Sequence, residues 1–178
     1  MALHIVYFHG YGSTPNTDKV NVLRQMLNAK VFAFPIDIDR DVAEQQLTYD
    51  IDMSLMNDIH ADDQVLFVGT SLGGWWASEM AALYKVPAIV INPSCDPSLG
   101  LKKYGVPEDL CAKYTPIKLA KINTYFIAEH DEVIDNTMLI EKLLIDGYNV
   151  FVDPDGDHRF NGLPFVRVVE FIKRNFAG

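Results

Sequence analysis

One short motif, G-T-S-L-G around Ser71, combines residue types that could perform covalent chemistry and fits the pattern G-x-S-x-G. It directly follows the apolar run at residues 64–68 and directly precedes a segment of helical character. The two glycines permit a sharp turn that would expose the serine hydroxyl above a sheet edge, and the following helix would direct its positive end toward the reacting centre. The motif therefore predicts that Ser71 is a nucleophile, and the alternative is that it only caps the helix.

A serine hydroxyl needs a base to take its proton, and His158 is the histidine best placed to do so. Of the five histidines, only His158 follows both the serine motif and a candidate acid in chain order. We expect His4, His9 and His60 to have structural or solvated roles.

The acid that orients this base should follow the apolar run at residues 124–127, where the next loop offers four carboxylates. Asp131 is the best placed of them. Position alone leaves Asp135 and Glu132 open as alternatives.

Two backbone N–H groups are candidates for holding an oxyanion. The turn H-G-Y-G at residues 9–12 follows the first apolar run, and in a doubly wound parallel sheet it would meet the Ser71 turn at the carboxyl edge. We assign the donors to the N–H groups of Tyr11 and Leu72.

Aromatic residues near these positions could form an acyl pocket in which the substrate binds. The candidates are Tyr11, one of Trp75 and Trp76, and Phe160. The alternative for the tryptophans is that they pack against the sheet.

The elements that must position these residues alternate along the chain. Short apolar runs predict strands, and longer segments with helical spacing lie between them. Because the runs are almost continuously apolar, both faces of the strands should be covered, as in a parallel α/β sheet. The predicted strands are residues 3–8, 31–34, 64–68, 88–91, 124–127 and 149–152; the predicted helices are 18–28, 41–59, 72–84, 138–144 and 165–176.

Residues 93–122 interrupt this alternation, since they contain four prolines and show no strong period. The segment is too long for a plain connection, so we expect either a small lid or a packed surface excursion. Its five lysines outnumber its three carboxylates, which suggests a positive surface that could receive an anionic leaving group; a solvated loop is the alternative.

Composition and charge exclude several classes of protein. The length of 178 residues suits one folded domain, and the net charge of -9 argues against nucleic acid as a partner. Neither a signal peptide nor an apolar run long enough for a membrane span is evident, so a cytoplasmic protein is expected. The two cysteines, Cys95 and Cys111, form no metal-binding motif and are expected to be reduced; a single disulfide between them is the alternative.

The chain resembles the α/β-hydrolase superfamily and, more narrowly, the small bacterial esterases of the YqiA/YcfP type. The resemblance runs nearly end to end. It is carried by H-G-Y-G-S at residues 9–13, G-T-S-L-G-G at 69–74, V-I-N-P-S at 90–94, D-E-V-I-D at 131–135 and G-D-H-R-F at 156–160.

This resemblance implies a minimal α/β-hydrolase fold over residues 1–178, with strand order 2-1-3-4-5-6, and it favours Asp131 as the acid. It further implies an esterase or thioesterase that acts on a small acyl ester or thioester without a cofactor. The alternative is a catalytically silent binding protein on the same fold. A flavodoxin-like nucleotide binder is disfavoured because neither phosphate-binding glycine motif occurs. The sequence leaves the oligomeric state open.

Overall fold

The computed structural model describes residues 1–57 and 59–176, and its centre is one parallel sheet. The six strands lie in the order β2-β1-β3-β4-β5-β6, and every neighbouring pair is parallel. This is the predicted order, and the α/β architecture is confirmed. The strands are β1 (Leu3–Phe8), β2 (Ala29–Ala33), β3 (Gln64–Thr70), β4 (Ala88–Ile91), β5 (Thr124–Ala128) and β6 (Asn149–Asp153).

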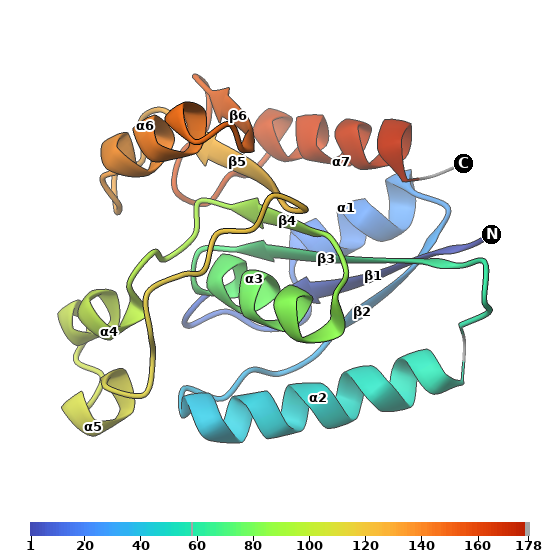
Figure 1. Cartoon of the computed structure of the whole chain (residues 1–178), viewed down its shortest axis with the longest axis horizontal. Coiled ribbons are helices and arrows are strands. Elements are labelled where there is room, and N and C mark those ends of the chain that lie inside the picture. Colours follow the sequence, from blue (N-terminus) through green and yellow to red (C-terminus); the bar gives the residue numbers. More distant parts are fainter. Residues whose placement is uncertain (58, 177–178) are drawn as a thin grey trace.

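Helices cover both faces of the sheet, as Figure 1 shows. Two hydrophobic clusters result, one beneath α2, α3 and α6 and the other beneath α1 and α7. Because the central strands are buried on both sides, their sequences are apolar without alternation. The main helices are α1 (Asp18–Met26), α2 (Arg40–Met56), α3 (Leu72–Tyr84), α6 (Thr137–Ile145) and α7 (Leu163–Asn175).

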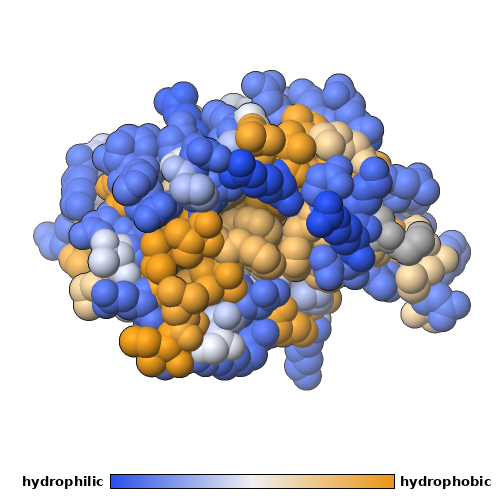
Figure 2. Space-filling model, turned by 90° about the horizontal axis from the view of Figure 1, so that it is seen from above, coloured by the Kyte–Doolittle hydropathy of each residue, from blue (hydrophilic) through white to orange (hydrophobic). Residues whose placement is uncertain are grey.

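The sheet is less well covered at its β6 edge. Phe151 and Val152 of β6 are exposed, and Leu144 and Ile145 of α6 are more exposed still. Figure 2 looks onto this side of the molecule and shows apolar side chains gathered there.

Several strand and helix boundaries differ from the predicted ones by a few residues. Strand β2 starts at Ala29, two residues before the predicted range 31–34, because its pairing with β1 begins at Leu3 opposite Ala29. Helix α2 ends at Met56, short of the predicted end at residue 59, and residue 58 lies outside the described residues.

Residues 93–122 form short helices beyond the carboxyl ends of the strands (Figure 1): α4 (Pro97–Gly100), the 3-10 turn η1 (Leu101–Tyr104) and α5 (Glu108–Cys111). The segment is anchored to α3, since Trp75 Nε1 donates to the carbonyl of Thr115 at 2.8 Å and Ser78 Oγ donates to that of Lys118 at 2.8 Å. Cys111 and Tyr114 are buried in the core. The segment is therefore packed against the domain over much of its length.

Both cysteines are free thiols, Cys111 in the core and Cys95 partly buried. Among the described residues, no helix has the length and apolar character that a membrane crossing requires.

Candidate active site

Ser71 sits in a strained turn between β3 and α3, with φ 57° and ψ −123°. The two flanking glycines make this turn possible. A Cβ at Gly69 would lie 1.9 Å from the carbonyl oxygen of Gly73, and a Cβ at Gly73 would lie 2.0 Å from that of Phe8. Larger residues would force the strand and helix apart, so the motif is required by close backbone packing.

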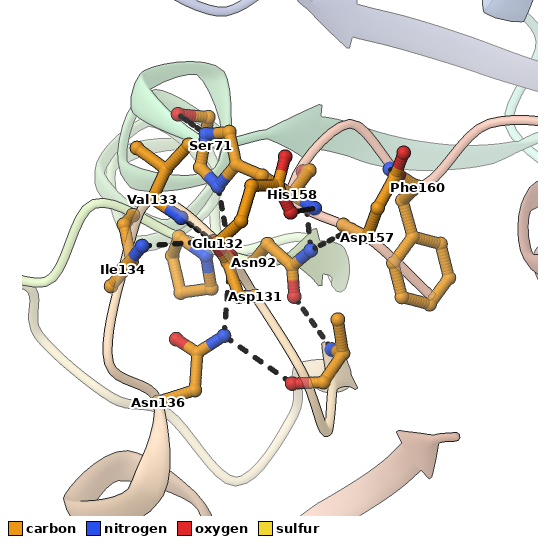
Figure 3. A network of polar contacts seen from close by, with 12 residues as sticks. Ser71, Asn92, Asp131, Glu132, Val133, Ile134, Asn136, Asp157, His158 and Phe160 are labelled. Carbon is orange, nitrogen blue, oxygen red and sulfur yellow. Dashed lines mark hydrogen bonds and ion pairs between the residues drawn. The ribbon is translucent and has the colours of Figure 1, made fainter. Parts of the chain in front are cut away.

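The side chain of Ser71 does not cap α3. Its hydroxyl oxygen instead lies 3.0 Å from Nε2 of His158, which comes from the loop after β6. On the other side of the ring, Nδ1 of His158 lies 2.8 Å from Oδ2 of Asp131 (Figure 3). With an N–H at Nδ1, His158 donates to Asp131 and leaves Nε2 free to accept from the serine hydroxyl.

Asp131 is held as an acceptor in the loop after β5. Its side chain is fully buried, and its Oδ1 accepts from the N–H groups of Val133 and Ile134, both at 2.8 Å. Oδ2, which faces His158, also receives a bond of 3.3 Å from Asn136 Nδ2. Both carboxylate oxygens of Asp131 therefore accept hydrogen bonds, and these contacts fix the direction of the side chain.

The other two acids that position alone left open have different contacts. Glu132 accepts from the backbone N–H of His158 at 3.0 Å, so it binds the loop and not the ring. Asp135 accepts from Thr137 N–H at the start of α6, and this bond lowers the pKa of Asp135.

Asn92 is an important residue of the site that sequence reasoning did not single out. It is fully buried at the end of β4, with φ 39°. Its Nδ2 donates to the carbonyls of Asp157 at 2.9 Å and His158 at 3.2 Å, and its Oδ1 accepts from Ala128 N–H at 2.7 Å. Asn92 thus ties the His158 loop to the ends of β4 and β5 (Figure 3). The sequence signal that could have identified Asn92 is its position as a polar residue between the apolar run at residues 88–91 and Pro93.

The two proposed oxyanion donors belong to segments that meet beside Ser71. Leu72 is the first residue of α3, where a backbone N–H has no partner within the helix. Gly10 lies against the same turn, since a Cβ there would be 3.6 Å from Cβ of Ser71. The structure thus brings the backbone next to Tyr11 close to the serine.

Two cavities of different character adjoin Ser71 and His158. The smaller, of about 200 Å³, is the apolar lobe, which is lined by residues including Leu72, Cys95, Leu99, Leu101 and Ile134. The larger, of about 580 Å³, is the polar lobe, which is lined by residues including Thr17, Asp18, Lys19, Glu132, Arg159 and Asn161. Tyr11 and Tyr104 border both lobes, with ring centroids 5.5 Å apart.

Trp75 and Phe160, expected as pocket residues, line neither lobe. Trp75 is fully buried because it faces the 93–122 segment, where it packs against Trp76 and Tyr114. Phe160 has φ 52° and turns its fully buried ring under Gly156, where it supports the loop that carries the histidine. Of the three aromatic candidates, only Tyr11 borders the cavities.

The lysines of residues 93–122 mostly have other contacts. Lys102 pairs with Glu108, Lys113 with Asp39, and Lys118 with Glu79, while Lys121 contacts the carbonyl of Asp146 and the ring of Tyr148. Only Lys103 lines a cavity next to the serine, the apolar lobe. The segment therefore does not present the broad positive surface that its composition suggested.

Comparison with solved structures places this architecture among α/β hydrolases. Alpha/beta hydrolase domain-containing protein 10 from mouse superposes with a TM-score of 0.65 at 17% identity, covering 96% of this chain and 88% of that one. An esterase of Pyrococcus furiosus superposes with a TM-score of 0.68 at 16% identity, covering 97% and 82%. At these identities the likeness establishes the fold.

Sequence relatives define the family. A UPF0227 protein of Serratia proteamaculans is 26% identical over 168 residues, which is 89% of this chain and 92% of the relative. The UPF0227 protein YcfP of Salmonella arizonae is 24% identical over 172 residues, with the same coverage. The family model described as "Uncharacterised protein family (UPF0227)" matches residues 4–173. The chain, with its α/β-hydrolase fold, therefore belongs to the UPF0227 family, of the YcfP/YqiA type.

Proposed function

We propose that the protein is a serine hydrolase that cleaves carboxylic esters or acyl thioesters through an acyl-enzyme on Ser71. The observation that carries the proposal is the continuous set of contacts from Ser71 Oγ to His158 Nε2 and from His158 Nδ1 to Asp131 Oδ2. A serine that is strained, uncapped and in contact with a supported imidazole is equipped to act as a nucleophile. The esterase among the structural neighbours adds support through the shared fold.

In the acylation step, Ser71 Oγ attacks the acyl carbon while its proton moves to Nε2 of His158. Asp131 holds the reactive tautomer and stabilises the imidazolium. The N–H groups of Tyr11 and Leu72 bind the oxygen that becomes negative. When the tetrahedral intermediate collapses, the bond to the alcohol or thiol breaks and His158 donates its proton to that leaving group.

In the deacylation step, His158 takes a proton from a water molecule, whose oxygen attacks the acyl carbon. The second tetrahedral intermediate collapses, the proton returns from His158 to Ser71, and the carboxylic acid is released. Each step uses only groups of this chain and water.

The direct test is hydrolysis of 4-nitrophenyl butyrate and a butyryl thioester by the wild-type protein and by Ser71→Ala. We expect turnover of at least one of the two compounds, and loss of that turnover in Ser71→Ala with an unchanged circular dichroism spectrum. Equal turnover by the variant would contradict the assignment. A folded wild-type protein that turns over neither compound would favour the alternative of a binding protein.

A further inference from the structure

The polar lobe contains an ammonium group that the catalytic scheme does not use. Lys19, in the first turn of α1, lines this lobe together with Ser71 and His158. Its Nζ donates to Oδ1 of Asn161 at 2.5 Å and lies 5.6 Å from the ring centroid of Phe165. The ammonium group thus lies between α1 and the start of α7, next to Asn161, which also lines the lobe.

Within residues 1–57 and 59–176, Lys19 has no direct ion pair in the free protein. It forms no ion pair with any carboxylate of the part of the chain that the structure describes, and its one hydrogen bond goes to a neutral amide. Burial lowers the pKa of Lys19 to about 8, although the nearby carboxylates of Asp157 and Asp18 act in the opposite direction. A partly buried cation without a directly paired carboxylate is costly, and an anionic ligand in contact with it would relieve this cost.

The other charged residues that line the polar lobe are compatible with an anionic ligand at Lys19. Arg159, next to the histidine in sequence, is a second cation on the wall. Glu132 also lines the lobe, but it accepts from the backbone N–H of His158. Asp18 is exposed at the start of α1, where its charge favours the helix terminus.

The two lobes therefore offer different chemistry beside Ser71 and His158. The apolar lobe has leucine and isoleucine side chains that suit an acyl chain. The polar lobe is larger and is lined by Lys19, which has no direct ion pair among the described residues. We propose that the polar lobe holds the leaving group and that Lys19 selects leaving groups bearing an anionic oxygen function, a carboxylate or a phosphate. This inference rests on the proposed function of Ser71.

The test compares three butyrate esters that differ in one substituent of the leaving phenol: 4-butyryloxybenzoate, 4-butyryloxyphenyl phosphate and the neutral 4-butyryloxybenzamide. The measured quantity is kcat/KM for each anionic ester divided by kcat/KM for the amide. In Lys19→Met, which keeps the aliphatic stem without the charge, we expect this ratio to fall by about tenfold or more. Lys19→Arg should retain most of the ratio. The two anionic arms distinguish a carboxylate preference from a phosphate preference.

Lys173→Met is the matched control, because Lys173 is exposed near the end of α7 and lines neither lobe. Its ratio should equal that of the wild type. An unchanged ratio in Lys19→Met, or an equal fall in Lys173→Met, would overturn the proposal. A loss that appears in Lys103→Met instead would assign the selectivity to the apolar lobe and also overturn it.

A binding measurement separates this proposal from the proposed function. The phenols 4-hydroxybenzoate and 4-hydroxybenzamide are titrated calorimetrically into wild type, Lys19→Met and Lys173→Met. We expect tighter binding of the benzoate by wild type and Lys173→Met, and loss of that preference in Lys19→Met. If the preference is found without ester turnover, the catalytic proposal fails and the subsite stands. If esters are hydrolysed without any preference that depends on Lys19, the subsite fails alone.

Discussion

At the scale of single residues, the carboxylate that faces His158 differs from its neighbours in burial and in contacts. The side chain of Asp131 is inaccessible and receives two backbone N–H bonds on one oxygen, which leaves the other directed at the imidazole. Asp135 is exposed and bonds to the start of α6. The same loop thus provides one acid for the ring and another for the helix.

Replacing Asp131 with Asn tests this assignment. The amide would present an N–H toward Nδ1 of His158 and favour the tautomer in which Nε2 carries the hydrogen, so the ring could no longer accept the serine proton. We expect kcat at saturating ester to fall by about 1,000 to 10,000-fold. Asp135→Asn is the control and should lose less than about half of the activity. A similar kcat in the two variants would argue against Asp131.

The preference for an anionic leaving group that Lys19 is proposed to give should depend on pH. The Lys19 pKa of about 8 means that the ammonium is protonated below this pH and neutral above it. The charged groups facing it are Asp18 on its own helix and Asp157 and Arg159 on the opposite loop. The preference for the benzoate ester over the benzamide ester should therefore decline as pH rises through about 8 in the wild type. In Lys19→Arg the preference should persist to higher pH. A wild-type preference that is constant from pH 7 to about 9.5 would contradict the role of Lys19.

At the scale of elements, the contacts among Ser71, His158 and Asp131 depend on how the loop after β6 is attached to the sheet. Asn92 bonds that loop and the end of β5 from a fully buried position. It touches no reacting atom, so it is a positioning residue. Its left-handed φ of 39° is one that Asn tolerates better than most residues.

Asn92→Ala should therefore lower kcat by about tenfold or more while KM changes little, because the imidazole would no longer be held at hydrogen-bond distance. Asn123→Ala is a matched control, since Asn123 is also buried and its Oδ1 accepts from Ala88 N–H at 3.0 Å at the opposite end of β4. Both variants should lose about 1 to 3 kcal/mol of unfolding free energy in urea titrations. Comparable kcat losses in the two variants would reduce Asn92 to a structural role.

At the scale of the whole molecule, Trp75 joins residues 93–122 to the core of the α/β fold. Trp75→Phe removes the N–H that binds the Thr115 carbonyl and part of the contact with Tyr114. We expect the free energy of unfolding to fall by about 1 to 3 kcal/mol, with KM for the ester unchanged. A raised KM at unchanged stability would indicate that Trp75 contacts the substrate.

The strand order could be predicted because the chain resembles a known family over nearly its whole length. The α/β class could be predicted because buried parallel strands are apolar without alternation. The structure brings together Ser71, Asp131 and His158, whose motifs were visible; their catalytic roles stay a prediction. Motif spacing does not indicate which way a nearby side chain points.

Several contacts of the site could not be predicted from the sequence, because they depend on the direction in which a side chain points. Trp75 and Phe160 are close to catalytic candidates along the chain, yet helix phase turns one into the core and a left-handed turn does the same to the other. Asn92 and Lys19 acquire their significance only from partners far away in the sequence, at residues 157–158 and 161 respectively. Contacts of this kind depend on tertiary packing.

The central claim, that Ser71 is an activated nucleophile, is tested most directly by intact-mass analysis after treatment with a fluorophosphonate. The wild-type protein should gain one adduct, which peptide mapping should locate on Ser71. Ser71→Ala should gain none, and His158→Ala should react far more slowly because the base is missing. Labelling at another residue, or equal labelling of all three proteins, would contradict the account, as would a folded wild-type protein that stays unlabelled and also fails to hydrolyse short esters.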